Sequence, residues 1–193
     1  ITAECYGPNS RARILYADGR IARIVNNYAR ISFNFGPTLL SWMEHHAPEV
    51  LEAIVEGDRA SVERHAGHGN AIAQVYNHVI MPLASRRDKV TQVQWGLADF
   101  RHHFGREAEA IWLAETAVDV ETLEVLAEAK MRFVILAPDQ AARIRPLHGG
   151  EWQEVSGGRV DPSRAYLVRL PSGRTLACFF YDGALAHTVS FGD

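Results

Sequence analysis

Along the 193-residue chain, stretches with a strand-like pattern of apolar and polar residues alternate with stretches that have a helix-like pattern. Residues 20–37 read as extended structure, and apolar residues at helical spacing follow them, ahead of a second predicted helix over residues 48–65. Residues 70–83 predict a short buried strand that leads into a loop. From residue 89 to residue 105 an apolar side chain returns every three or four positions, which predicts an amphipathic helix ended by glycine.

The clearest unit lies in the middle of the chain. A strand is predicted over residues 109–114, a turn over residues 115–118, and a helix from Asp119, which is a suitable N-cap. A further strand over residues 132–138 leaves a connection long enough for a right-handed parallel crossover. Glu115 would then stand at the carboxyl end of a parallel strand, where α/β sheets and β/α barrels place ligands and catalytic groups.

The last third of the chain has a different pattern. Residues 151–183 contain two β-rich runs joined by Pro171, Ser172 and Gly173, which predicts a β-hairpin. Together with the alternation of strands and helices upstream, this favours an α/β fold.

Composition and charge limit the partners and the cellular location that we expect for this protein. A formal charge of -3 with 9 histidines provides no basic field for nucleic acid or an anionic membrane, so neither is expected as a partner. The two cysteines, Cys5 and Cys178, form no CxxC pair, which favours a reducing, cytoplasmic location. No stretch predicts a membrane span or a signal peptide. No cofactor is predicted, and the oligomeric state cannot be read from the sequence.

Three stretches carry a resemblance to a known family: "RISFNFGPTLLSWM", "GHGNAIAQVYNHVIMPL" and "FRHHFGREAEAIWLAETAVDVETLEVLAEAKMRFVILAP". The chain resembles glycoside hydrolase family 57, in particular its amylase-like bacterial subgroup, over most of its length. The "FG" followed by "WLxE" is the more specific part. The resemblance implies an incomplete seven-stranded β/α barrel and a retaining enzyme acting on α-glycosidic bonds of oligo- or polysaccharides.

The resemblance also implies roles for single residues. Glu115 in "IWLAE" matches the catalytic nucleophile, and His78 in "NHVIMPL" matches a histidine that lines the sugar site. A histidine motif on the first strand and a general-acid aspartate motif have no convincing counterpart, and Asp182 in "FFYDGALAH" is a weak candidate for the acid. Residues 1–193 are therefore expected to be one incomplete catalytic barrel, truncated at both ends and inactive alone.

Further substrate contacts are predicted at Trp112, Asn70, Gln74 and Asn77, because aromatic rings stack on sugars and amides bind hydroxyl groups. Each has an alternative structural role: Trp112 in the core, and the amides as partners of the backbone. Glu115 could likewise belong to a solvated loop, and His78 could be a hydrogen-bonded, half-buried histidine. Strand alternation places Leu113 and Glu115 on one face and Trp112 on the other.

The histidines do not predict a metal site. His65 and His68 have a spacing that a metal on a helix could use, and His102 could bind a metal with a partner across the site. In neither case does the sequence supply a third ligand of suitable type at a matching spacing. His102 and His103 are assigned to a solvated helix face. Two other functions stay open: a metal-dependent deacetylase or α-mannosidase type of barrel, and a carbohydrate-binding domain without catalysis.

Overall fold

The computed structural model describes residues 2–191, which form two compact units. The first unit comprises the described residues up to His78 together with Gln94–Ala108. The second comprises Val79–Val93 and the described residues from Glu109 onward. Helix α4 (Arg86–Phe104) contributes residues to both units, and each unit is described here by itself.

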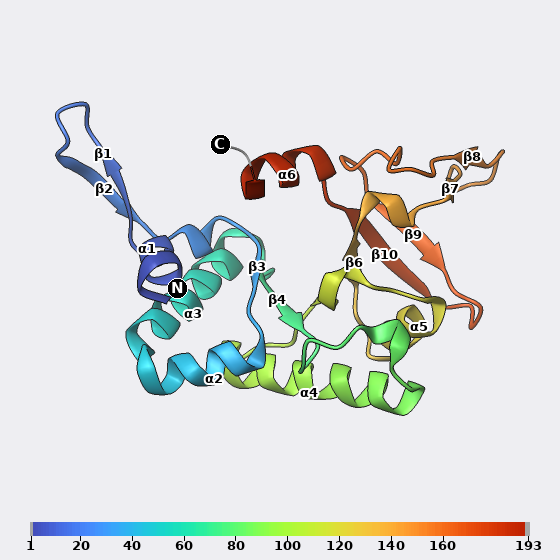
Figure 1. Cartoon of the computed structure of the whole chain (residues 1–193), viewed down its shortest axis with the longest axis horizontal. Helices are drawn as coiled ribbons and strands as arrows, with labels where there is room; N and C mark the ends of the chain where they lie inside the picture. Colours follow the sequence, from blue (N-terminus) through green and yellow to red (C-terminus); the bar gives the residue numbers. More distant parts are fainter. Residues whose placement is uncertain (1, 192–193) are drawn as a thin grey trace. The chain divides into compact units, whose positions relative to one another are not determined.

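The first unit combines helices with a β-hairpin and a short parallel pair of strands (Figure 1). In chain order its elements are η1 (Thr2–Tyr6), α1 (Gly7–Ser10), β1 (Ala12–Leu15), β2 (Ile21–Val25), η2 (Asn27–Ala29), β3 (Phe33–Asn34), α2 (Pro37–His46), α3 (Pro48–Arg64) and β4 (Ala71–Gln74). Strands β1 and β2 are antiparallel, whereas β3 and β4 are parallel. Prolines in the first turns of α2 and α3 help to start these helices, since a proline lacks only an N–H that would be unpaired there.

Aromatic side chains form much of the core of the first unit. The Tyr28 ring packs edge-on against Phe33, with ring centroids 4.9 Å apart, and against Phe35 at 5.8 Å. Met43 from α2 and Ile54 from α3 are completely buried in the same unit. Burial of such large apolar groups stabilises the packing of α2 against α3 and of α3 against η2.

The second unit is built on a three-stranded sheet. In chain order its elements are η3 (Met81–Leu83), the first part of α4, β5 (Ile111–Trp112), η4 (Ala114–Thr116), α5 (Val120–Glu128), β6 (Phe133–Leu136), η5 (Pro138–Gln140), β7 (Arg143–Ile144), β8 (Gln153–Glu154), β9 (Tyr166–Arg169), β10 (Thr175–Phe180) and α6 (Gly183–Phe191). Strand β10 lies in the middle, parallel to β6 and antiparallel to β9 (Figure 1).

Strands β5 and β6 run in the same direction, as the parallel bridge between Ala110 and Phe133 shows. The predicted strand, helix, strand unit is therefore confirmed, with α5 as its connection. The predicted strand over residues 109–114 is wrong in its extent, because regular pairing covers only β5. The backbone turns immediately after Leu113.

The other predicted elements are confirmed in type. The α/β class is correct, α4 ends at Gly105 in left-handed backbone with φ of 68°, and the hairpin at Pro171 to Gly173 joins β9 to β10. Within residues 2–191, no helix combines the length and the apolar character needed to cross a membrane.

Gly96 brings the second half of α4 close to the end of β4. A Cβ added at Gly96 would lie 2.0 Å from the carbonyl oxygen of Gln74. Backbone cannot give way as a side chain can, so only glycine permits this approach. The end of β4, which carries predicted site residues, is thus held against the helix.

Gly96→Ala should destabilise the protein by about 2 kcal/mol or more, because the added methyl group forces the backbone apart. The same change in an unconstrained helix interior stabilises by about 1 kcal/mol, so the sign of the effect is diagnostic. Urea unfolding measures it, with Gln94→Ala on an exposed position of α4 as the control. A Gly96→Ala protein as stable as the wild type would contradict the proposed contact.

Candidate active site

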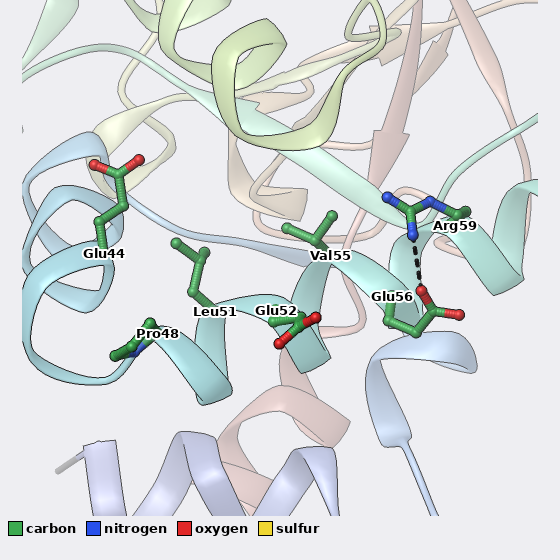
Figure 2. Close-up of a pocket in the computed structure, with 7 residues that line it drawn as sticks. All are labelled: Glu44, Pro48, Leu51, Glu52, Val55, Glu56 and Arg59. Carbon is green, nitrogen blue, oxygen red and sulfur yellow. Dashed lines mark hydrogen bonds and ion pairs between the residues drawn. The ribbon is translucent and has the colours of Figure 1, made fainter.

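An open groove of about 470 Å³ follows α3 in the first unit (Figure 2). Its walls combine apolar side chains with glutamates, namely Glu44, Pro48, Leu51, Glu52, Val55, Glu56 and Arg59. None of the six site residues predicted from the sequence belongs to this lining. The groove is therefore a separate feature from the strand ends described next.

Glu115 stands on a turn of unusual backbone geometry. Its φ is 55° and that of Thr116 is 52°, so two consecutive residues other than glycine adopt the left-handed conformation. For a β-branched residue such as Thr116 this is a genuine outlier. Left-handed backbone costs about 1–2 kcal/mol per residue, and such strain gathers at functional sites. The turn is thus a candidate site on its geometry alone.

The surrounding structure fixes this turn. The N–H groups of Thr116 and Ala117 donate to the carbonyl oxygens of Leu113 and Ala114, each at 3.0 Å. The Gln140 amide donates to the Thr116 carbonyl oxygen at 2.7 Å. Ala114 and Thr116 are buried while Glu115 is exposed. The strained backbone therefore presents the carboxylate of Glu115 at the surface of the second unit.

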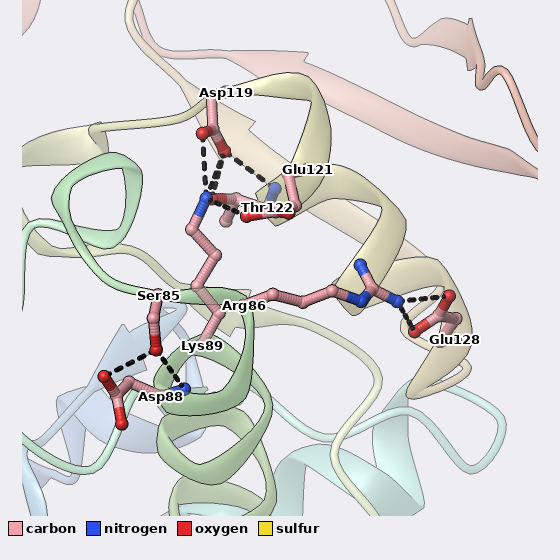
Figure 3. Close-up of polar contacts among 8 residues, drawn as sticks. All are labelled: Ser85, Arg86, Asp88, Lys89, Asp119, Glu121, Thr122 and Glu128. Atoms are coloured by element: carbon pink, nitrogen blue, oxygen red, sulfur yellow. Dashed lines mark hydrogen bonds and ion pairs between the residues drawn. The ribbon is translucent and has the colours of Figure 1, made fainter.

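A buried lysine anchors the chain just beyond the turn (Figure 3). The Lys89 side chain is only 1% exposed, and its Nζ lies 2.8 Å from Asp119 Oδ2 and 2.9 Å from Glu121 Oε2. Asp119 also accepts a 2.7 Å hydrogen bond from the Thr122 N–H, which confirms its predicted role as the N-cap of α5. One cation thus ties α4 to the start of α5, four residues after Glu115.

These contacts change the ionisation of the groups involved. Burial alone would raise the pKa of Asp119, but hydrogen bonds from Lys89 and Thr122 outweigh burial and lower the pKa. For Lys89, burial alone would lower the pKa, and the two carboxylates raise it. Both shifts favour the charged pair.

Trp112 is the last residue of β5 and is half-buried. The prediction that strand alternation places Glu115 on the face of Leu113 is wrong. The strand ends at Trp112, and the left-handed turn sets the direction of Glu115 instead. Sequence periodicity has no means of showing a change of backbone hand between two ordinary residues.

Asn70 directly precedes β4 and Gln74 is its last residue, and both amides have partners within the first unit. The Asn70 side chain is buried and donates to the Tyr28 carbonyl oxygen at 3.1 Å. The Gln74 amide donates to the side-chain oxygen of Asn34 on the neighbouring strand β3. These contacts stabilise the strand pair, which is the structural alternative that the sequence left open.

Asn77 and His78 follow the carboxyl end of β4 and are exposed. Val75, between them and the strand, is buried and holds this segment to its unit. Asn70, Gln74, Asn77 and His78 thus gather around β4 in the first unit, whereas Trp112 and Glu115 gather at the end of β5 in the second.

Asp182, the weak candidate for a general acid, stands at the start of α6. Its side chain accepts a 3.0 Å hydrogen bond from the Leu185 N–H, the contact of a helix N-cap. Asp182 therefore has a structural role at the start of α6.

The histidines after Phe100 differ from the prediction. His102 is 69% exposed at its side chain, as predicted, but His103 is only 2% exposed, so its assignment to a solvated face is wrong. Asp99 and Glu44 enclose the ring of His103. The sequence analysis also missed Lys89. A signal was present, because Lys89 and Lys130 are the only lysines in a chain that otherwise uses arginine.

Comparison with known proteins identifies the family. The sequence model of Glycosyl hydrolase family 57 matches residues 4–192, nearly the whole chain. The chain therefore belongs to this family.

Two known proteins are similar over 107 residues, or 55% of this chain. They are the 4-alpha-glucanotransferase of Thermococcus litoralis, at 22% identity, and alpha-amylase 1 of Dictyoglomus thermophilum, at 26%. The matched segment corresponds to 15% of the length of each relative.

Two solved structures support the α/β fold. That of the 4-alpha-glucanotransferase of Thermococcus litoralis superposes with a TM-score of 0.60 at 18% identity, covering 86% of this chain and 24% of that protein. The alpha-amylase AmyC of Thermotoga maritima gives a TM-score of 0.52 at 17% identity, covering 79% and 26%. At these identities the likeness concerns the fold.

Lys89→Met should lower the free energy of unfolding by about 1–2 kcal/mol. Loss of one partner of a fully buried ion pair costs about 3–5 kcal/mol, but Asp119 and Glu121 remain partly hydrated, which reduces the loss. Denaturant unfolding of Lys89→Met and of the matched control Lys130→Met, at an exposed lysine, measures the difference. Equal losses in the two variants would contradict a specific anchor.

Asp119→Asn should reduce the sensitivity of the protein to acid. The pKa of Asp119 is lowered in the folded state, so its stabilising contribution is complete above the unfolded value of about 3.9 and is lost as pH falls through the folded pKa. Asparagine keeps the N-cap but cannot titrate. Unfolding free energies from pH 6 to pH 2 should therefore fall less steeply in the variant; parallel curves would argue against the pairing.

Proposed function

We propose that this chain is part of a catalytic domain that cleaves or transfers α-glycosidic bonds of oligo- or polysaccharides with retention of configuration. Membership of Glycosyl hydrolase family 57 supports the proposal, as do the names of the two similar proteins, a glucanotransferase and an amylase. The chain corresponds to a small part of those proteins, so the activity is proposed for the polypeptide that contains it.

The strained turn at Glu115 is the observation that carries the proposal. Retaining enzymes need one carboxylate that attacks the anomeric carbon and a second carboxyl group, about 5–5.5 Å away, that protonates the leaving oxygen. Glu115 is exposed, follows a strand that runs parallel to its neighbour, and rests on a backbone that the fold holds against its local preference. A nucleophile needs this fixed orientation, because small displacements reduce the rate steeply.

The remaining assignments follow the same scheme. We assign Glu115 as the nucleophile and His78, Asn77 and Trp112 as contacts to the sugar. Asn70 and Gln74 are proposed to act by holding β4, since their amides bind within the first unit. Within residues 2–191 we assign no general acid, because Asp182 caps α6.

We further propose that residues 1–193 contribute to a single (β/α)7-type barrel. Three parallel relations support it: β3 with β4, β5 with β6, and β6 with β10. The β9–β10 hairpin is an addition to this pattern. A metal-dependent barrel of the deacetylase or α-mannosidase type has less support. Such a barrel needs a set of metal ligands at strand ends, and within residues 2–191 we assign no such set there.

The test is Glu115→Gln in the full natural polypeptide that contains this chain, assayed on α-glucans. We expect turnover to fall by at least about 10³-fold, because binding and positioning remain while the nucleophile is lost. Glu151→Gln, at another exposed glutamate, is the matched control. Thermal unfolding should be unaffected in both.

A second measurement separates the nucleophile from a general acid. Glu115→Gly, supplied with an activated α-glycosyl donor and azide, should form the β-glycosyl azide, because azide attacks from the face that the carboxylate leaves. An acid variant would instead form the α-glycosyl azide through an intact nucleophile. Unchanged turnover in Glu115→Gln, or the α-azide from Glu115→Gly, would overturn the assignment.

A further inference from the structure

Glu44, His102 and His103 bring three metal-binding groups together in the first unit. Glu44 lies in the last turn of α2, and both histidines lie in the last turn of α4. Their donor atoms are all within 4.8 Å of one another. Glu44 Oε1 is 3.2 Å from His102 Nε2 and 3.4 Å from His103 Nε2.

In the neutral form of His103, two hydrogen-bond acceptors lie next to each other in this cluster. Its Nδ1 lies 3.0 Å from the carbonyl oxygen of Asp99, which can only accept, so Nδ1 carries a proton. In the neutral ring Nε2 then carries a lone pair, and the carboxylate oxygen of Glu44, 3.4 Å away, is also an acceptor. Within residues 2–191 this buried nitrogen has no hydrogen-bond partner. A cation between the two acceptors would satisfy both.

The surroundings favour a metal cation in this position. Asp99 binds the far side of the His103 ring, with its carboxylate 3.4 Å from Nδ1, and such outer partners orient histidines that bind metals. Two helix C-termini contribute partial negative charge. Glu44 also lines the groove along α3, where Glu52 adds negative charge, while the charge of Glu56 is paired with Arg59 at 2.9 Å (Figure 2).

The distances fit a transition metal. Around a tetrahedral zinc ion, bonds of about 2.0–2.1 Å place neighbouring ligand atoms about 3.3 Å apart. The two distances from Glu44 Oε1 to the histidine nitrogens, 3.2 Å and 3.4 Å, are close to this value. The exposed ring of His102 can turn to complete the set, and the open side leaves room for a water molecule as the fourth ligand.

We propose that Glu44, His102 and His103 form a binding site for a divalent transition-metal ion such as Zn²⁺, which joins the end of α2 to the end of α4. Two imidazoles and one carboxylate suit such ions better than Mg²⁺ or Ca²⁺, which prefer oxygen ligands. The site would stabilise the first unit by linking two helices through bonds that the unfolded chain cannot form.

A proton is the competing occupant. Burial lowers the pKa of His103, but hydrogen bonds to Asp99 and the charge of Glu44 outweigh burial and raise the pKa. An imidazolium would also satisfy Glu44. The experiment must therefore distinguish a metal from a proton at Nε2.

Zinc binding is measured by competition with a chromophoric chelator at pH 7.5, together with thermal unfolding with and without ZnCl2. The wild type should bind one ion and unfold at a higher temperature with zinc, while MgCl2 and CaCl2 have no such effect. Glu44→Gln and His102→Gln, both at exposed residues that should leave the fold intact, should each weaken binding at least about tenfold. His45→Gln is the matched control, an exposed histidine on α2 whose ring bonds to the Ser41 carbonyl oxygen.

Nitrogen NMR of the histidine side chains shows directly whether His103 Nε2 binds a metal or a proton. Zinc should shift the Nε2 resonance of His103 while Nδ1 keeps its proton. Co²⁺ should give the intense visible absorption of a tetrahedral ion, lost in His102→Gln. The proposal is overturned if His103 Nε2 keeps a proton in the presence of zinc, if no ion binds, or if His45→Gln weakens binding as much as His102→Gln.

Discussion

The first unit depends on the buried carboxylate of Asp58. Its side chain is 3% exposed and accepts from Arg106 Nε at 2.8 Å and Nη2 at 2.9 Å. The same carboxylate accepts from the Ala71 N–H at 2.7 Å, and Arg106 donates to the Ala71 carbonyl oxygen at 3.0 Å. One ion pair thus fixes where β4 begins. Because loss of either partner would leave an uncompensated buried charge, this ion pair links α3, β4 and the segment after α4.

This ion pair also explains a glycine. A Cβ at Gly69 would lie 2.2 Å from the Arg106 guanidinium, so the glycine leaves space for the arginine. Lys89 has a comparable place in the second unit, where it holds the start of α5. In each unit a cation with little exposure thus fixes a piece of backbone. Arg106 fixes the start of β4 in the first unit, and Lys89 fixes the start of α5 in the second. The exposed residues with proposed chemical roles therefore rest on contacts that are mostly hidden from solvent.

Sequence patterns predicted those parts of the fold that depend on local chemistry. The N-cap at Asp119, the end of α4 at Gly105 and the turn between β9 and β10 each follow from the preferences of one or two residues. The length of β5 was not predictable, because a run of apolar residues looks the same in a strand and in a buried turn. Burial of His103 was likewise hidden, since it depends on Glu44, 59 positions earlier in the sequence.

The candidate site was predictable in position but not in geometry. The motif and the end of a strand located Glu115, whereas the left-handed backbone at Glu115 and Thr116 follows from tertiary contacts such as the bond from Gln140. No propensity favours that conformation for either residue. Placement of the amides of Asn70 and Gln74 required the partner strand and loop as well.

At position 115 the residue that suits the backbone best differs from the glutamate that the proposed nucleophile role requires. Glycine, and to a lesser degree asparagine, adopts left-handed backbone more easily than glutamate does. A laboratory selection that rewarded only folded protein would therefore move this position away from glutamate, and one that required the proposed catalysis would restore it. The choice between these residues would show which property was under selection.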